Sequence, residues 1–196
     1  MNFLKDKTLT LTALGVTTLV ILALTMLKAF YRIGYLWLPE RQRVRKIEWQ
    51  PFDMILNSKN WFAPVFETVG NILLFIPFGL LVFVVLHQSN RLSTWSRARL
   101  ALVSIVVGAG FSLIIETAQY VFALGRSDID DLWCNTLGTI IGVGLAVAAG
   151  PQRYRLWCWI ALAAAVVFGV IVSYGEELGD APRIASVMRW AGIPWR

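Results

Sequence analysis

The stretch LALVSIVVGAGFSLIIETAQYVFA, residues 100–123, decides the fold of this chain. It is long enough to cross the hydrocarbon core of a bilayer, which takes about 20 predominantly apolar residues in a helix. The stretch carries one charged residue, Glu116, in its last third. It therefore predicts a transmembrane helix, and its single carboxyl group is a feature that lipid alone does not explain.

Four further apolar runs accompany this one. The five predicted spans cover about residues 8–30, 68–86, 100–123, 132–149 and 156–174. With 57% hydrophobic and only 15% charged residues, the chain is far more apolar than an ordinary soluble domain. We therefore expect an all-α, polytopic transmembrane bundle of about five helices, folded as a single membrane domain over residues 1–196.

The net charge of +6 does not indicate a nucleic-acid partner, because the basic residues lie at the ends of the apolar runs. In those places Lys and Arg contact lipid head groups and fix the orientation of the helices. The tryptophans fall in loops or near span ends, which is typical of the membrane interface. We expect the lipid bilayer, and no nucleic acid, as the surroundings of this chain.

The distribution of positive charge favours a cytoplasmic N-terminus. With that orientation, the short inner segments carry seven cations, namely Lys5, Lys7, Arg91, Arg97, Arg99, Arg153 and Arg155. The long outer loop 31–67 carries six, namely Arg32, Arg41, Arg43, Arg45, Lys46 and Lys59. Charges on short loops weigh more in setting topology, so the 124–131 loop and the C-terminal tail are predicted to lie outside. Residues 48–67, with Pro51 and Pro64, are predicted to lie along the interface.

Polar residues gather around the third span. Ser112, Glu116 and Gln119 share one helical face, and an ionised carboxylate at that depth needs protein or water beside it. In the alternative interpretation, Glu116 lies near the interface and its carboxylate simply reaches the lipid head groups. The loop that follows, GRSDIDD at residues 125–131, has a plain structural explanation: Gly125 ends one helix and Asp130 or Asp131 caps the next. That explanation does not account for three acids together with Arg126.

The neighbouring spans also contain residues that shape packing. Gly138 and Gly142 form a small-xxx-small pair that lets another helix approach closely. Pro77 frees the carbonyl of Leu73 and predicts a bend in the second span. Asn135 points the same way as Asp131 and either bonds across to a neighbouring helix or belongs to a site.

Together these residues predict a polar site near one membrane face. The candidate ligand-binding residues are Asn71, Glu116, Gln119, Arg126, Asp128, Asp131 and Asn135. Their oxygen atoms suit Mg²⁺ or Ca²⁺, but the spacing matches no metal motif, so we expect neither a metal nor a cofactor. His87 ends the second span and is expected at the interface, which leaves no Ser/His/Asp set. Cys134 and Cys158 are expected to be free thiols.

Two blocks resemble the VanZ-like family of bacterial membrane proteins. Residues 71–79, NILLFIPFG, are similar to its N-x₃-F-x-P-x-G signature, which places Asn71, Pro77 and Gly79 on family positions. Residues 112–142, SLIIETAQYVFALGRSDIDDLWCNTLGTIIG, resemble its E-x-x-Q and D-x-x-D-x-x-x-N-x-x-G block. The resemblance covers about residues 50–145. It implies a multi-pass protein of the bacterial cytoplasmic membrane and a link to teicoplanin resistance.

Three functional hypotheses follow. The leading one is an outward-facing pocket that binds a lipid head group, a lipid-linked cell-wall precursor or a lipophilic glycopeptide, with Arg126 holding an anionic group. The alternative is a membrane-embedded enzyme that acts on a lipid phosphate or glycan through Glu116 and the Asp128/Asp131 loop. In the third, the polar residues serve only helix packing.

Overall fold

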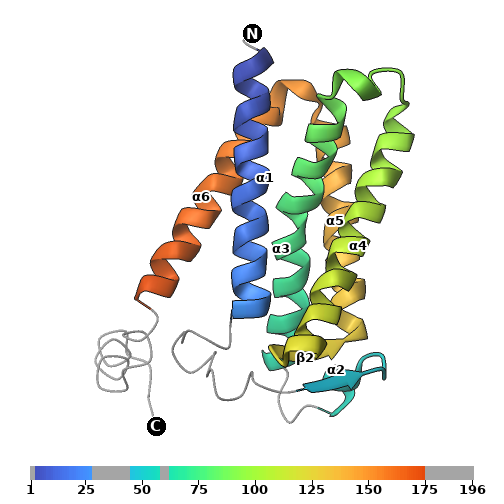
Figure 1. The fold of residues 1–196 in the computed structure, drawn as a ribbon, viewed down its shortest axis with the longest axis vertical. Coiled ribbons are helices and arrows are strands. Elements are labelled where there is room, and N and C mark those ends of the chain that lie inside the picture. The colour runs from blue at the N-terminus through green and yellow to red at the C-terminus, as the bar shows by residue number, and fades with distance from the viewer. Residues whose placement is uncertain (1–2, 28–44, 58–61, 175–196) are drawn as a thin grey trace.

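The computed structural model describes residues 3–27, 45–57 and 62–174, and it contains five long helices (Figure 1). These are α1 (Phe3–Met26), α3 (Phe62–His87), α4 (Arg97–Phe122), α5 (Ile129–Ala149) and α6 (Tyr154–Ser173). Each is long and apolar enough to cross a membrane. The prediction of an all-α bundle of about five spans is confirmed. The helix starts differ from the predicted limits by a few residues, and residues 28–30 of the first predicted span lie outside the described residues.

The five helices run alternately in opposite directions (Figure 1). One end of the bundle holds the start of α1 and the links that contain the short helices η3 (Asn90–Leu92) and η4 (Pro151–Arg153). We call it the N-terminal end. The opposite end holds strand β1 (Arg45–Glu48), helix α2 (Asp53–Asn57) and strand β2 (Gly125–Asp128), and we call it the strand end. Helix α6 diverges from α1 as it approaches the strand end.

The closest helix packing joins α3 and α5 at small residues. A Cβ atom added to Gly79 of α3 would lie 2.5 Å from the carbonyl oxygen of Thr139 in α5. Added Cβ atoms at Gly138 and Gly142 would collide with backbone carbonyl oxygens of α3. The glycines therefore let the two backbones touch, as small-xxx-small pairs do in membranes. Helix α3 continues through Pro77, and its buried side chains include Phe75 at the centre of the bundle.

The two strands were not expected from the sequence. Strands β1 and β2 pair in parallel, with Arg45 opposite Gly125 and Glu48 opposite Asp128. Residues 125–131 had been predicted as a tight loop. Pairing with β1 draws the first four of them into extended backbone and ties the long connection after α1 to the connection between α4 and α5.

The helix ends beside β2 also differ from the prediction. Helix α4 ends at Phe122, and Ala123, not Gly125, adopts the left-handed conformation (φ 51°, ψ 44°). The N–H of Leu124 donates to the carbonyl of Gln119 over 3.0 Å, and that of Ala123 to the carbonyl of Tyr120 over 3.4 Å, which is the Schellman pattern. Helix α5 is capped by Asp128, whose side chain accepts the N–H of Asp130, and not by Asp130 or Asp131.

The stretch predicted to lie along the interface is partly described. Trp49, Phe52 and Leu56 are exposed around α2, with 71%, 60% and 69% of each residue accessible. Apolar side chains with this exposure at the ends of membrane helices suit the interface, and the placement stays a prediction. Residues 58–61, the basic residues at 41 and 43, and the C-terminal tail 175–196 lie outside the described residues.

Candidate functional site

The carboxyl group within the third span holds strand β2. Glu116 is only 6% exposed, and its Oε2 accepts the backbone N–H of Asp128 over 2.8 Å. The N–H of a residue at the end of a short strand would otherwise lack a partner in a buried place, which is costly. Glu116 therefore anchors the strand end of α4 to the connection that follows it.

Asp128 makes two contacts of its own. Its Oδ1 accepts the N–H of Asp130 over 2.9 Å, and its Oδ2 pairs with Nη2 of Arg126 over 2.9 Å. Burial raises the pKa of Asp128, while the Asp130 N–H and the Arg126 guanidinium act in the lowering direction. Arg126 is thus engaged by a carboxylate of its own strand, and its role as an anchor for an anionic ligand stays a prediction.

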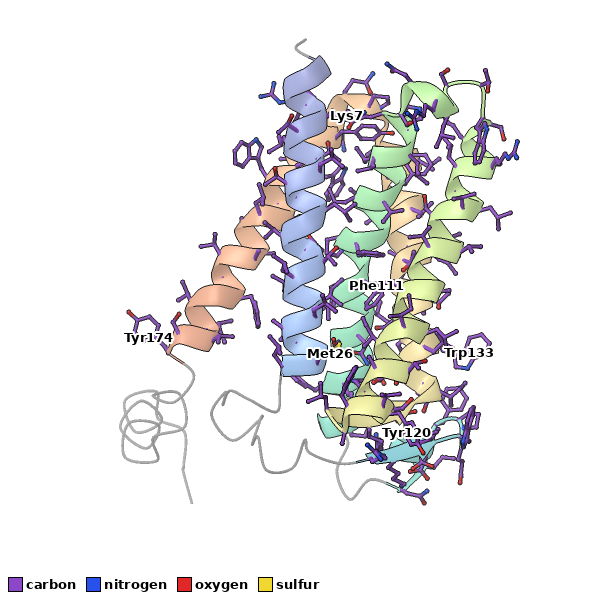
Figure 2. All side chains as sticks on the ribbon, viewed as in Figure 1. Lys7, Met26, Phe111, Tyr120, Trp133 and Tyr174 are labelled. Atoms are coloured by element: carbon purple, nitrogen blue, oxygen red, sulfur yellow. The ribbon has the colours of Figure 1, made fainter. Side chains whose placement is uncertain are left out.

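A groove of about 200 Å³ lies between the strand pair and the facing ends of α4 and α5, and we call it the strand groove. Its polar and aromatic lining consists of Glu48, Trp49, Glu116, Thr117, Tyr120, Ser127 and Asp128. Its apolar lining consists of Ile47, Leu113, Ile129 and Leu132. Figure 2 shows Tyr120 at the strand end, opposite Lys7 at the N-terminal end. Glu116 and Asp128 therefore reach one common cavity.

The strand groove continues onto the outer surface of α4. A second, wholly exposed depression is lined by Leu113, Ile114, Thr117, Ala118, Val121 and Phe122. Leu113 and Thr117 line both hollows, so the two are contiguous. Ile114 and Phe122 are 66% and 65% exposed on the outside of the bundle, where a membrane helix meets acyl chains. The groove thus opens sideways toward lipid.

The other predicted residues lie outside the strand groove. The side-chain amide of Asn71 in α3 donates to Oδ1 of Asp131 in α5. Deeper in the bundle, Asn135 donates to Oγ of Ser112 over 2.9 Å. Gln119 reaches the other way and donates to the carbonyl of Thr25, at the end of α1, over 3.1 Å.

The seven predicted ligand-binding residues therefore do not all line one cavity. All seven residues lie in the half of the bundle at the strand end, but only Glu116 and Asp128 share the groove. Asp131, Asn71, Asn135 and Gln119 join helices to one another. Asp131, which was expected to join Glu116 and Asp128 in one recess, is not among the residues that line the groove. The enzyme hypothesis used these three acids together, so it loses one of its residues from the groove.

Sequence reasoning missed five polar or aromatic groove residues: Glu48, Trp49, Thr117, Tyr120 and Ser127. Thr117 and Tyr120 follow Glu116 by one and four positions, so the helical periodicity that selected Gln119 would also have found Tyr120. Glu48 and Trp49 belong to β1 or follow it. The alternation of Lys46, Ile47, Glu48 and Trp49 was a weak signal for an extended segment.

The comparison with known proteins settles the family. A family model described as VanZ/LLP1 matches residues 14–150 of the chain. The chain belongs to the VanZ/LLP1 family. The matched region runs from within α1 to the residue after α5, and so includes both strands and the whole strand groove. Together with the five apolar helices, the match makes the chain a multi-pass membrane protein of that family.

A second comparison gives a relative over a shorter range. The chain is 35% identical to Protein VanZ of Enterococcus faecium over 79 residues, which is 40% of this chain and 43% of that protein. The chain thus matches less than half the length of this relative. No solved structure matches the chain significantly.

The described side chains at the two ends of this VanZ/LLP1 protein differ in charge. Among the described side chains, the N-terminal end carries one acid, Asp6, beside six basic residues, namely Lys7, Arg91, Arg97, Arg99, Arg153 and Arg155. The described strand end carries seven acids and three basic residues, namely Glu48, Glu67, Asp53, Glu116, Asp128, Asp130, Asp131, Arg45, Lys46 and Arg126. Among the described residues, no group of three or more His, Cys, Asp or Glu side chains is arranged to hold a metal ion.

Proposed function

We propose that this VanZ/LLP1 protein holds an amphiphilic molecule of the bacterial envelope in the strand groove. The candidates are a lipid, a lipid-linked cell-wall precursor or a lipophilic glycopeptide. One observation carries the proposal: the cavity beside Glu116 and Asp128 adjoins an apolar depression on the outer side of α4, and Leu113 and Thr117 line both. An amphiphile has the same two parts, a polar head and an apolar chain, and it reaches such a groove by lateral movement in the bilayer.

We further propose that the strand end faces outward from the cytoplasmic membrane. Among the described side chains Arg and Lys are more numerous at the N-terminal end, where they lie on short connections, and this supports the orientation because positive charge on short cytoplasmic loops weighs most in setting topology. Envelope lipids and glycopeptides are then available to the groove from the outer leaflet and the external medium.

The proposed consequence is lower susceptibility to teicoplanin. The family's association with resistance to this glycopeptide and the partial match to Protein VanZ support it. Binding of the drug itself, or of the envelope molecule that the drug needs, would have this effect.

A variant that fills the groove tests the proposal without removing a polar contact. Thr117 is exposed on α4, lines both hollows, and bonds only its own helix through the carbonyl of Leu113 among the contacts described. We expect Thr117→Trp to lose co-purifying envelope lipid or precursor, measured by native mass spectrometry, and to lower the teicoplanin concentration that cells tolerate. Val106→Trp is the matched control, because Val106 is 61% exposed on the same helix and lies outside both hollows.

The proposal is wrong if Thr117→Trp, expressed at the level of the parent, keeps both the bound amphiphile and the drug tolerance. Orientation is tested separately with single cysteines at Ser127 and Ser89 in a background without Cys134 and Cys158. An impermeant thiol reagent should label residue 127 in intact cells and residue 89 only after lysis. The reverse labelling would overturn the outward orientation.

A further inference from the structure

Of the residues that line the strand groove, those of a charged type are all acidic. They are Glu48, Glu116 and Asp128. Lys46 pairs with Glu48, and Arg126 pairs with Asp128, but neither cation belongs to the lining. Glu116 and Asp128 are each only 6% exposed, so little of the groove surface is polar, but the charge of the three acids still favours a positive group in the groove over a phosphate or carboxylate.

Two aromatic rings stand beside these acids. Trp49 and Tyr120 both line the groove, and the faces of such rings attract ammonium and guanidinium groups. The guanidinium carbon of Arg45 already lies 6.0 Å from the centre of the Tyr120 ring. This wall thus combines carboxylates with aromatic faces, which is a suitable environment for an organic cation.

Two cations pair with the groove acids from outside the lining. The side chain of Lys46 is 62% exposed and that of Arg126 is 28% exposed, so both remain accessible to a second, negative group. Acids in the lining and cations paired with them complement a zwitterionic head group whose amine enters the groove and whose phosphate stays outside. The α4 depression then offers the apolar surface that an acyl chain needs.

On this charge complementarity, and resting on the function proposed above, we propose that the strand groove selects a lipid whose head group carries a protonated primary amine. Phosphatidylethanolamine is the zwitterionic lipid that we take as its representative. The amine would donate to the carboxylate oxygens of the groove, and charge-assisted hydrogen bonds of this kind are about twice as strong as neutral ones.

The test compares three lipids with identical acyl chains on the purified full-length protein. They are phosphatidylethanolamine, its N-acetylated form, which has lost the positive charge, and phosphatidylglycerol. Retention of each lipid in detergent is measured by native mass spectrometry. We expect about a tenfold preference for phosphatidylethanolamine over the other two, a factor that corresponds to ~1.4 kcal/mol.

Glu48→Gln should reduce that preference severalfold. This variant is chosen over Glu116 because Glu48 lines the groove without bonding the N–H that ends β2. Asp53→Asn is the matched control, because Asp53 is an acid of the same end that lies outside the groove lining. The control should keep the preference of the parent.

The outcomes separate this inference from the proposed function. If the three lipids are retained equally, or phosphatidylglycerol is preferred, while Thr117→Trp still removes them, the amine selection is wrong and the groove proposal stands. If Thr117→Trp removes none of them, both are overturned. A preference for phosphatidylethanolamine that Glu48→Gln and Thr117→Trp each abolish supports both.

Discussion

Removing the carboxyl group of Glu116 should loosen the strand pair before it affects the bundle. In Glu116→Ala the buried N–H of Asp128 loses the acceptor that now lies 2.8 Å away. An unsatisfied buried donor costs about 1–3 kcal/mol. Glu116→Gln keeps a carbonyl oxygen at the same distance along the side chain, so it loses only the charge assistance, roughly 1 kcal/mol.

Hydrogen–deuterium exchange of the purified protein measures this cost at the right place. Amides of residues 125–128 should exchange about 5- to 150-fold faster in Glu116→Ala, the range that corresponds to ~1–3 kcal/mol. Residues 45–48 should follow them, because β1 pairs only with β2 within the described part of the chain. The core of α3 should keep its protection. Thr117→Ala, one position along, is the control and should leave exchange in both strands unchanged.

Two results would refute the reasoning. Unchanged exchange at residues 125–128 in Glu116→Ala would mean that the Asp128 N–H does not depend on this carboxylate. Equal acceleration in Glu116→Gln and Glu116→Ala would mean that the charge and not the acceptor oxygen holds the strand. The first result would withdraw the structural role of Glu116, and the second would assign that role to its charge in place of its acceptor oxygen.

Three further predictions concern stability. Gly142→Ala should destabilise the protein strongly, by several degrees in thermal unfolding, because its Cβ collides with the carbonyl of Ile76; Gly144→Ala, with no atom within 4 Å, should be neutral. Ala123→Gly should stabilise by about 1 kcal/mol in chemical unfolding, because φ 51° is strained for alanine; a loss of stability would contradict the assigned cap. Burial raises the pKa of Asp128 in the folded protein above 3.8, so the contribution of this group to stability is greatest at low pH and falls as the pH rises above that value. The thermal unfolding temperature should therefore decline less steeply with pH in Asp128→Asn than in the parent. Parallel curves for the two proteins would contradict this role of Asp128.

The membrane spans could be predicted from the sequence because one physical requirement determines them. A helix that crosses lipid must satisfy its own backbone and present about 20 apolar residues, so length and hydropathy suffice. The five runs give that signal individually. Their ends are less certain, because a helix continues past the apolar run wherever a cap or a neighbour satisfies the backbone. Helix α5 begins at Ile129, three residues before the apolar run, since Asp128 caps it there.

The strand pair had no comparable signal. Each strand has four residues, and 76 residues separate the end of one from the start of the other. The sequence GRSD of β2 lacks the β-branched and aromatic residues that favour strands. Its extended conformation depends on partners from elsewhere in the chain, namely β1 and the carboxylate of Glu116. Strands so far apart in the sequence pair only once the helices have packed, so the local sequence does not predict the pairing.

The candidate site was predicted as a set of residues but not as an arrangement. The cost of burying Glu116 in a membrane predicted a polar partner for it, and Asn135 was expected either to bond a neighbouring helix or to belong to a site. Which partner each one takes depends on helix rotation and on the close α3–α5 contact, and neither is encoded in spacing along one helix. Asp131 and Asn135 lie four residues apart on α5, yet one bonds Asn71 in α3 and the other bonds Ser112 in α4.

The double role of the groove acids decides how function in this family should be dissected. Glu116 and Asp128 line the groove, and the same two residues join β2 to α4 and cap α5. An alanine at either position therefore removes both a lining residue of the groove and a hydrogen bond that holds the groove together. Loss of function there is expected under a binding role and under a purely architectural one. Thr117→Trp and Glu48→Gln change the interior of the groove and keep the hydrogen bonds that Glu116 and Asp128 accept. If these two variants fold as the parent does and lose the amphiphile, the polar residues of the third span serve a ligand as well as the fold.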